Sequence, residues 1–309
     1  RFPFCLMTSK EIGSDIRQSA TLLRDGGVIG MPTETVYGLA ALASNEEAVR
    51  RVFDIKGRPY DHPLIVHLSP TEDLSQWGHF NSDATALAQS FWPGPLTLLV
   101  PRTARVPDWV TGGRDTVAIR VPHHPVAESL LELVADGVVA PSANLFGKVS
   151  PTEAKHVFND LGKLVDYILD GGPSQHGVES TIVECIDTPT ILRPGSISKD
   201  DIEAVLHISM QADTGESRAP GMLTSHYAPN ARVVLVETIE ELRNQTSELS
   251  ISGTRCISLQ FDSIQEYAFR LYASLRKADE TGVDVVVALL PPDQGLGVAI
   301  RDRLRKASH

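Results

Sequence analysis

Residues 28–40 read Val-Ile-Gly-Met-Pro-Thr-Glu-Thr-Val-Tyr-Gly-Leu-Ala, so an apolar run leads directly into a polar turn. Residues 28–31 are predicted to form a short buried strand, because all four are apolar or small and a proline ends the run. Thr33, Glu34 and Thr35 then place two hydroxyls and a carboxylate just after the strand. These side chains can cap a turn or contact a ligand, and this stretch alone leaves both interpretations open.

Apolar runs of this kind recur through the first two thirds of the chain. Predicted strands cover residues 64–68, 96–100, 117–121, 138–140, 167–169, 181–186 and 190–193. Predicted helices cover residues 11–25, 46–56, 126–135 and 152–161. Some strands follow one another directly, while others are separated by a helix. This order predicts an α/β fold with a mixed, twisted sheet rather than a regular series of strand–helix–strand units.

A polar, irregular stretch at residues 209–230 is typical of a linker. It separates a first domain, residues 1–208, from a C-terminal domain, residues 231–309. The C-terminal domain alternates strands with helices, its apolar strands at 233–236, 256–259 and 283–290 and its main helical stretches at 264–278 and 296–304. This alternation predicts a small, Rossmann-like three-layer α/β domain whose parallel sheet is buried on both faces.

The overall charge excludes one class of function. The 309 residues include 28 Lys and Arg against 39 Asp and Glu, a formal net charge of −11 at pH 7. Residues 1–208 alone hold 17 basic and 26 acidic side chains, a net charge of −9. Such a surface repels nucleic acid as a whole, so we expect no stable direct binding of tRNA. Any anionic ligand must instead be held by a local cluster of cations.

Cysteine content and hydropathy indicate the compartment. Cys5, Cys185 and Cys256 are far apart in sequence, which argues against a disulfide framework or a four-thiolate zinc site. The longest apolar run, at 285–290, is only six residues, and the N-terminal residues lack the pattern of a signal peptide. We therefore expect a soluble, cytoplasmic protein with no membrane contact.

The clearest candidate for anion binding is Lys56-Gly57-Arg58, at the end of a predicted helix. Two cations here can complement the helix dipole, or they can clamp an anion, with Arg58 binding through its fork and Lys56 as a point charge. The acidic balance of the chain favours the clamp. His67, within an apolar strand, is typical of a satisfied core residue. Arg120 alternates with apolar residues, and if buried it needs an Asp, a Glu or a ligand carboxylate as its counter-ion.

Further polar residues stand at the ends of predicted strands. Ser142 and Asn144 are typical turn formers, and Ser150 is a possible helix cap. Together with the cations, which include Arg193, these hydroxyls and amides suit a nucleoside triphosphate beside a small molecule that carries a carboxylate. The sequence contains no Walker A loop, no GxGxxG fingerprint and no GxSxG or HExxH motif.

Seven segments, taken in order, resemble the YrdC-like domain of threonylcarbamoyl-AMP synthases. They are MPTETVYGLA (31–40), KGRPYDHPLIVHL (56–68), FWPGPLTLLV (91–100), VAIRVP (117–122), PSANLFGKVSPT (141–152), ESTIV (179–183) and ILRPG (191–195). SHYAP at 225–229, followed by the α/β tail, resembles the two-domain form of that family.

The resemblance implies a nucleotidyltransferase that makes threonylcarbamoyl-AMP and pyrophosphate from L-threonine, bicarbonate or CO2, and ATP, for modification of tRNA. Mg²⁺ would enter on the ATP phosphates, with no metal ligand from protein side chains. Downstream tRNA threonylcarbamoyltransferase proteins would use the product. No protein nucleophile is needed, which agrees with the absence of a nucleophile motif.

The resemblance also implies roles for individual residues, with Lys56 and Arg58 as the catalytic pair. L-threonine would be faced by Thr35, His67, Arg120, Ala140 and Ser180. ATP would be surrounded by Lys56, Arg58, His62, Thr116, Ser142, Asn144, Ser150, Arg193 and Tyr227. Tyr227 would close over the nucleotide as part of a lid at 219–229, which we expect to become ordered when ATP binds. Two residues depart from the frequent family pattern, namely His62 and Phe146.

Two other functions are weighed against this one. A YrdC-like carbamoyltransferase would use carbamoyl phosphate, but such enzymes carry additional domains that this chain lacks. A YrdC-like RNA-binding module is disfavoured by the acidic first domain unless its cations are strongly segregated.

Overall fold

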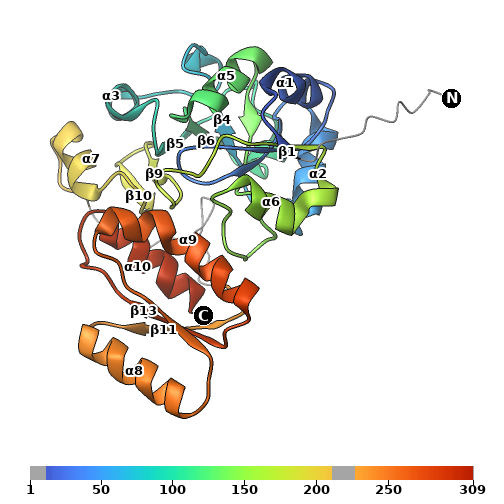
Figure 1. The fold of residues 1–309 in the computed structure, drawn as a ribbon. Helices are drawn as coiled ribbons and strands as arrows, with labels where there is room; N and C mark the ends of the chain where they lie inside the picture. Colours follow the sequence, from blue (N-terminus) through green and yellow to red (C-terminus); the bar gives the residue numbers. More distant parts are fainter. Residues whose placement is uncertain (1–11, 211–226, 309) are drawn as a thin grey trace.

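The computed structural model describes residues 12–210 and 227–308 (Figure 1). The first ten strands are β1 (Ile12–Gly13), β2 (Ile29–Met31), β3 (Gly38–Leu42), β4 (Ile65–His67), β5 (Leu96–Pro101), β6 (Thr116–Arg120), β7 (Val138–Val139), β8 (Tyr167–Leu169), β9 (Thr181–Glu184) and β10 (Thr190–Arg193). The helices among and after them are α1 (Ile16–Arg24), α2 (Glu46–Lys56), α3 (Ser82–Phe91), α4 (Asp108–Thr111), α5 (Pro125–Val134), α6 (Ala154–Leu161) and α7 (Lys199–Leu206), with short 3₁₀ turns η1 (Leu74–Gln76) and η2 (Gly162–Leu164).

These strands form one sheet in the order β1-β8-β2-β3-β7-β4-β6-β5-β9-β10. The sheet contains parallel pairs, such as β4 with β6, and antiparallel pairs, such as β5 with β6. The mixed sheet expected from the order of elements is therefore confirmed. Helices α1 and α5 cover one face, while α2, α3, α6 and α7 contribute to the larger core on the other side (Figure 1).

Strand pairing brings distant polar residues to one edge of the sheet. The parallel register of β4 and β6 sets His67 beside Arg120. Gly38 at the start of β3 forms a bridge to Ser142, just beyond β7. Pairing of β5 with β9 sets Leu96 opposite Thr181. The ends of these strands therefore meet where the sequence places its isolated polar side chains.

The predicted helix at 11–25 is shorter in the structure. Residues 12 and 13 pair as β1 with β8, and α1 begins at Ile16. The reason is local, because the Asp15 side chain accepts a hydrogen bond from Gln18 N and so caps the helix there.

The C-terminal domain contains β11 (Arg232–Val236), α8 (Ile239–Ile251), β12 (Cys256–Leu259), α9 (Ile264–Thr281), β13 (Val285–Leu289) and α10 (Leu296–Ala307). Its parallel sheet has the order β11-β13-β12. Helix α8 lies on one side of this sheet, and α9 and α10 lie on the side that faces the first domain (Figure 1). The predicted three-layer arrangement is confirmed. None of the described helices is long and apolar enough to cross a bilayer.

The two domains share a hydrophobic cluster. Val36, Val149 and Val178 of the first domain pack in the same cluster as residues of α9, including Leu271 and Tyr272. The C-terminal domain therefore rests on the edge of the first sheet where the polar strand ends meet.

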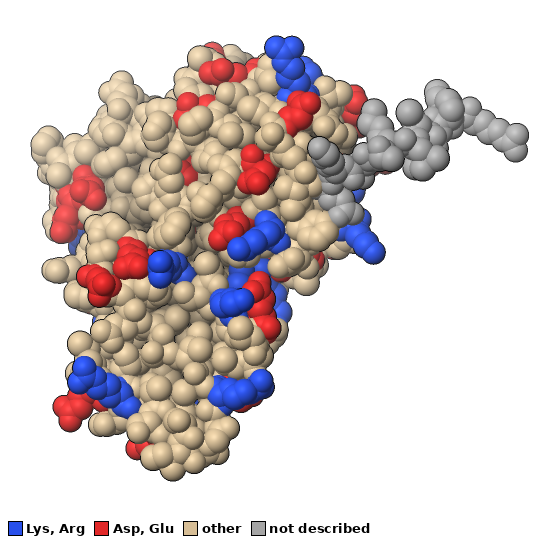
Figure 2. All heavy atoms as spheres, viewed as in Figure 1, with Lys and Arg blue, Asp and Glu red and all other residues tan. Residues whose placement is uncertain are grey.

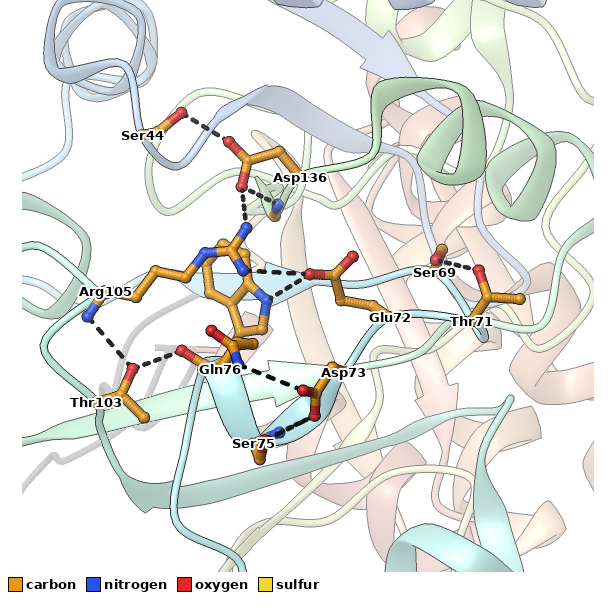
Figure 3. Close-up of polar contacts among 12 residues, drawn as sticks. Ser44, Ser69, Thr71, Glu72, Asp73, Ser75, Gln76, Thr103, Arg105 and Asp136 are labelled. Atoms are coloured by element: carbon orange, nitrogen blue, oxygen red, sulfur yellow. Dashed lines mark hydrogen bonds and ion pairs between the residues drawn. The ribbon is translucent and has the colours of Figure 1, made fainter.

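A separate polar network braces the segment around η1 (Figure 3). Arg105 bridges two carboxylates, with Nη1 3.4 Å from Glu72 Oε1 and Nη2 3.0 Å from Asp136 Oδ1. Its guanidinium carbon lies 4.3 Å from the centre of the Trp77 ring. None of these residues lines the cavity described below, so the network serves the fold.

Candidate active site

A cavity of about 50 Å³ lies at the edge where the polar strand ends meet. Its walls come from several segments of the first domain and from Tyr227, near the end of the linker. The lining residues are Thr35, Val36, Arg58, Ile65, His67, Arg120, Ala140, Pro141, Ser142, Glu179, Ser180, Arg193 and Tyr227. Three arginines in one small buried space make an anion the natural ligand.

Arg120, at the end of β6, is buried and has a counter-ion within the protein. Its Nη2 lies 2.7 Å from Glu34 Oε1, and its Nη1 donates to Thr35 Oγ1 at 2.8 Å. Burial alone would raise the pKa of Glu34, but the Arg120 guanidinium holds that pKa below its ordinary value. Of the two counter-ions considered from the sequence, the structure therefore supplies the acidic side chain. The guanidinium still lines the cavity.

His67 is both a buried strand residue and a cavity residue. Its Nδ1 lies 3.3 Å from Ile65 O. Burial, and then the charge of Arg120, lower the pKa of His67 to about 3, so the ring is neutral at pH 7. A neutral ring that donates through Nδ1 keeps Nε2 as an acceptor.

Lys56 and Arg58 are set by the end of α2. Gly57 adopts the left-handed conformation (φ 62°) that ends the helix and turns the chain between the two cations. The Lys56 ammonium is buried and donates to Ser142 O at 2.5 Å and to Asn144 O at 2.6 Å. Burial, and then the charge of Arg58, lower the pKa of Lys56 well below its ordinary value.

Arg58 has a buried donor group, its Nε, without a partner in the described residues. Its Nη2 donates to Pro63 O at 2.9 Å, while its Nε is buried and has no hydrogen-bond partner in the described part of the chain. Burial lowers the pKa of Arg58 to about 10, which leaves it charged at pH 7. A buried N–H without a partner is costly, and an acceptor atom on a ligand would satisfy this donor.

Arg193, at the end of β10, is bound to Ser180. Its Nε and Nη2 donate to Ser180 O at 3.1 and 2.9 Å, and Nη2 also donates to Ser180 Oγ at 3.0 Å. The Ser180 hydroxyl lies 2.7 Å from Thr97 Oγ1 on β5. This corner of the cavity is therefore rigidly hydrogen-bonded.

The last wall is built against the C-terminal domain. Tyr227 is buried, has a left-handed backbone (φ 63°), and stacks on Tyr272 of α9 with ring centres 5.6 Å apart. The Arg303 guanidinium of α10 lies 5.2 Å from the centre of the Tyr227 ring. Burial raises the pKa of Tyr227 to about 12, so its hydroxyl stays protonated.

Nine of the site residues expected from the resemblance line the cavity. These are Thr35, Arg58, His67, Arg120, Ala140, Ser142, Ser180, Arg193 and Tyr227. Lys56 and Asn144 adjoin it through the main chain of 142–144, and Ser150 donates to the lining residue Glu179.

The remaining two expected residues lie farther out. The His62 ring contacts the Phe146 ring at 5.7 Å between centres, and the Arg58 guanidinium lies 6.0 Å from that same ring. The two departures from the family pattern are thus neighbours. Thr116 stands at the opposite end of β6 from Arg120. Of the expected lid, residues 219–226 lie outside the described part of the chain.

The sequence interpretation missed several contributors to the site. Glu34 and Glu179 each neutralise a buried arginine, and Tyr272 and Arg303 come from a domain for which no role was expected. A carboxylate directly beside the expected threonine contact Thr35 was a signal for Glu34. No sequence pattern pointed to Arg303, because its partner lies more than a hundred residues away.

Charged side chains and possible metal ligands also lie outside the cavity. On the face shown in Figure 2, basic side chains lie singly or beside acidic ones over both domains. Within residues 12–210 and 227–308, no three His, Cys, Asp or Glu side chains are grouped to hold a metal ion.

Comparisons with known proteins agree with this geometry. Residues 21–195 match the family model of the Sua5, YciO and YrdC proteins, described as telomere recombination, and residues 197–309 match the model described as threonylcarbamoyl-AMP synthase, C-terminal domain. The chain is 41% identical to the threonylcarbamoyl-AMP synthase of Pyrococcus abyssi, over 95% of this chain and 94% of that protein. Identity to the threonylcarbamoyl-AMP synthase of Bacillus subtilis is 42%, over 95% of this chain and 92% of that protein.

The solved structures give the same answer. The crystal structure of P. abyssi Sua5 complexed with L-threonine matches with a TM-score of 0.89 and 40% identity, covering 95% of this chain and 94% of that one. The match therefore spans both domains. By sequence and by fold, the chain belongs to the threonylcarbamoyl-AMP synthase family, in the form that joins a YrdC-like domain to a C-terminal Sua5 domain.

Proposed function

We propose that this protein is an L-threonylcarbamoyladenylate synthase, a nucleotidyltransferase that uses L-threonine, bicarbonate or CO2, and ATP. The observation that carries the proposal is the convergence of Arg58, Arg120 and Arg193, from three distant segments, on one buried cavity. Such a cavity suits a carboxylate and a polyphosphate held side by side. The product would pass to tRNA threonylcarbamoyltransferase proteins.

The proposed reaction has two steps. The neutral amine of threonine adds to the carbon of CO2 and loses a proton, which gives a carbamate. A carbamate oxygen then attacks the α-phosphorus of ATP in line, and the bond from that phosphorus to the β-phosphate oxygen breaks, releasing pyrophosphate. The protein supplies positioning and charge rather than a nucleophile.

The threonine half of the site centres on Arg120. In this proposal, Arg120 binds the amino-acid carboxylate, while Glu34 and Thr35 fix the plane of its guanidinium. The neutral ring of His67 accepts a hydrogen bond from the amine or the hydroxyl of threonine. Ala140 and Ser180 complete this half of the site, since both line the same cavity.

The ATP half centres on Arg58, whose Nε would donate to a phosphate oxygen. Lys56 would hold the 142–144 main chain against the nucleotide and add positive charge, and Arg193 would face the leaving pyrophosphate. The outer contacts would come from His62, Thr116, Ser142, Asn144 and Ser150, with Tyr227 covering the nucleotide.

Substrate entry requires the wall to move. At about 50 Å³, the cavity is narrow for a nucleoside triphosphate. ATP is far larger, so in this proposal Tyr227 leaves its present position when the nucleotide binds. Closure afterwards would exclude water from a carbamate and an adenylate that both hydrolyse readily.

Magnesium enters this proposal as part of the substrate, Mg-ATP. The two acidic side chains nearest the cavity, Glu34 and Glu179, are each bound to an arginine. Neither is therefore available as a metal ligand in this arrangement, and the phosphates would hold the ion.

The direct test mixes protein, L-threonine, bicarbonate and Mg-ATP, and follows pyrophosphate release with mass detection of the adenylate. We expect pyrophosphate and adenylate in equal amounts, both dependent on threonine. Arg58→Ala should raise KM for ATP, and Arg120→Ala should raise KM for threonine. Pyrophosphate release without threonine, or no release at all, would contradict the proposal.

A further inference from the structure

Glu179 is the point where the two domains meet at the cavity. Its carboxylate lines the cavity and accepts hydrogen bonds from three donors. Ser150 Oγ, from the first domain, lies at 2.6 Å, while Tyr272 OH of α9 and Arg303 Nε of α10 lie at 2.9 and 2.8 Å. A single carboxylate thus links an expected nucleotide contact, Ser150, to two side chains of the C-terminal domain.

Arg303 also contacts two further parts of the cavity wall. Its Nη2 donates to Pro194 O at 3.0 Å, the main-chain group that follows Arg193. Its guanidinium lies against the Tyr227 ring. One buried side chain of the C-terminal domain therefore contacts the supports of three separate parts of the nucleotide half, which are Ser150, Arg193 and Tyr227.

Burying the Arg303 charge costs free energy, which indicates that this side chain has a specific role at the domain boundary. The Arg303 side chain is fully buried, and burying a charge costs several kcal/mol unless good partners compensate. Burial raises the pKa of Glu179, but Arg303 and Arg193 lower it to about 2, so both members of the pair stay charged.

Arg301, two residues earlier on α10, shows the alternative arrangement. It is also buried, but its partners Pro291 O and Glu237 both belong to the C-terminal domain. Arg301 therefore stabilises its own domain, whereas Arg303 reaches Glu179 and Pro194 in the other one.

We propose that Arg303, assisted by Tyr272, is a positioning residue for the nucleotide half of the active site, contributed by the C-terminal domain. It acts by fixing Glu179 and the turn after Arg193, which hold the Ser150 hydroxyl, the Arg193 guanidinium and the Tyr227 ring in place. This inference rests on the proposed synthase function. Arg120, the centre of the proposed threonine half, does not touch this network, because it is held by Glu34 and Thr35 instead.

The test compares Arg303→Gln, Arg303→Lys and the matched control Arg301→Gln in the full chain. Steady-state kinetics with each substrate varied in turn give kcat and both KM values, and thermal melting gives Tm. For Arg303→Gln we expect a rise in KM for ATP of tenfold or more, with KM for threonine within twofold of wild type. Arg303→Lys should recover part of the loss, since an ammonium keeps the ion pair with Glu179 but not the second bond to Pro194 O.

The control separates positioning from stability. Arg301→Gln should leave both KM values within twofold of wild type, whatever its effect on Tm. If Arg303→Gln does not fold, Tyr272→Phe carries the test, because it removes one hydroxyl and keeps the ring stacked on Tyr227. We expect that variant to fold and to raise KM for ATP about threefold.

Two outcomes would overturn the inference. One is a wild-type KM for ATP in Arg303→Gln, or in Tyr272→Phe where Arg303→Gln does not fold. The other is an equal rise in both KM values, which would mean a general disturbance. Failure of the proposed function gives a different result, because the wild-type chain itself would then form no adenylate.

Discussion

At the scale of single residues, two buried carboxylates pair with arginines in and beside the cationic cavity. Glu34 binds Arg120, and Glu179 binds Arg303. Each pair is buried, and breaking such a pair leaves one uncompensated charge in a medium of low polarity. Within the described residues, Arg58 donates to the Pro63 carbonyl and forms no ion pair with a carboxylate, so its charge stays available to a substrate. In the proposed site, this difference separates Arg58 of the ATP half from Arg120 of the threonine half, which is paired with Glu34.

The Glu34–Arg120 pair predicts a strong coupling between two substitutions. Arg120→Met alone leaves Glu34 buried without its counter-ion, so the free energy of unfolding should fall by about 3 kcal/mol. Adding Glu34→Gln removes the stranded charge and should restore 1 kcal/mol or more, on the order of known coupling energies. Urea denaturation of the two single variants and the double variant measures this cycle. Strictly additive losses would show that the pair does not act as a unit.

Glu179 predicts how stability depends on acid. Its pKa is about 2 in the folded protein, against an ordinary 4.5, so its contribution is complete above pH 4.5 and is lost as pH falls towards 2. A shift of this size corresponds to about 3 kcal/mol. Thermal melting of Glu179→Gln between pH 2 and 5 should therefore show a flatter decline than wild type. The control is Glu240→Gln, at an exposed position on α8, and it should follow wild type.

At the scale of elements, α2 was predicted with correct bounds because both of its ends carry local signals. Asn45 accepts a hydrogen bond from Ala48 N, and Gly57 ends the helix in the left-handed region. The strand at 38–42 was missed, since its Gly-Leu-Ala-Ala-Leu sequence has no β-branched residue. Helix α3 (82–91) was also missed, although Asn81 caps it as Asn45 caps α2.

Site residues likewise differ in whether the sequence around them indicates their role. Site residues such as His67 and Arg120 were expected from the family resemblance, and the parallel pairing of β4 with β6 brings these two side by side. The bond from Arg303 to Glu179 joins residues 124 positions apart in two domains. Nothing in either local sequence specifies that contact, which depends on how α10 docks against the first domain.

Gly57 predicts a measurable link between a helix end and the site. A Cβ added there meets no atom within 4 Å. Gly57→Ala should therefore lower the free energy of unfolding only through the strain of a left-handed alanine, by about 1–2 kcal/mol. Because the same turn sets Lys56 and Arg58, we expect a severalfold rise in KM for ATP as well. Gly253→Ala is the matched control, with φ 74°, open space and a place in the C-terminal domain. It should lose similar stability in urea and keep the wild-type KM, and a shared KM effect would refute the link.

At the scale of the whole molecule, the last wall of the cavity depends on how closely the domains approach. Val36, Val149 and Val178 share a hydrophobic cluster with α9, and the stacked Tyr227 and Tyr272 lie in the same cluster. Because this apolar contact and the buried Glu179–Arg303 pair both cross the boundary, we expect the two domains to unfold together.

Gly177 is the tightest point of that boundary. It has φ 70°, and a Cβ there would lie 2.2 Å from Ala268 O on the backbone of α9. Gly177→Ala must therefore push α9 away from the first domain, in addition to the backbone strain. We expect calorimetry to resolve two unfolding transitions where wild type has one, and KM for ATP to rise because Tyr272 and Arg303 move with their domain. Gly172→Ala controls for the strain alone, since its φ is 82° and no atom lies within 4 Å of an added Cβ. If both alanine variants melt in a single transition at the same temperature, close docking of α9 is not what joins the domains.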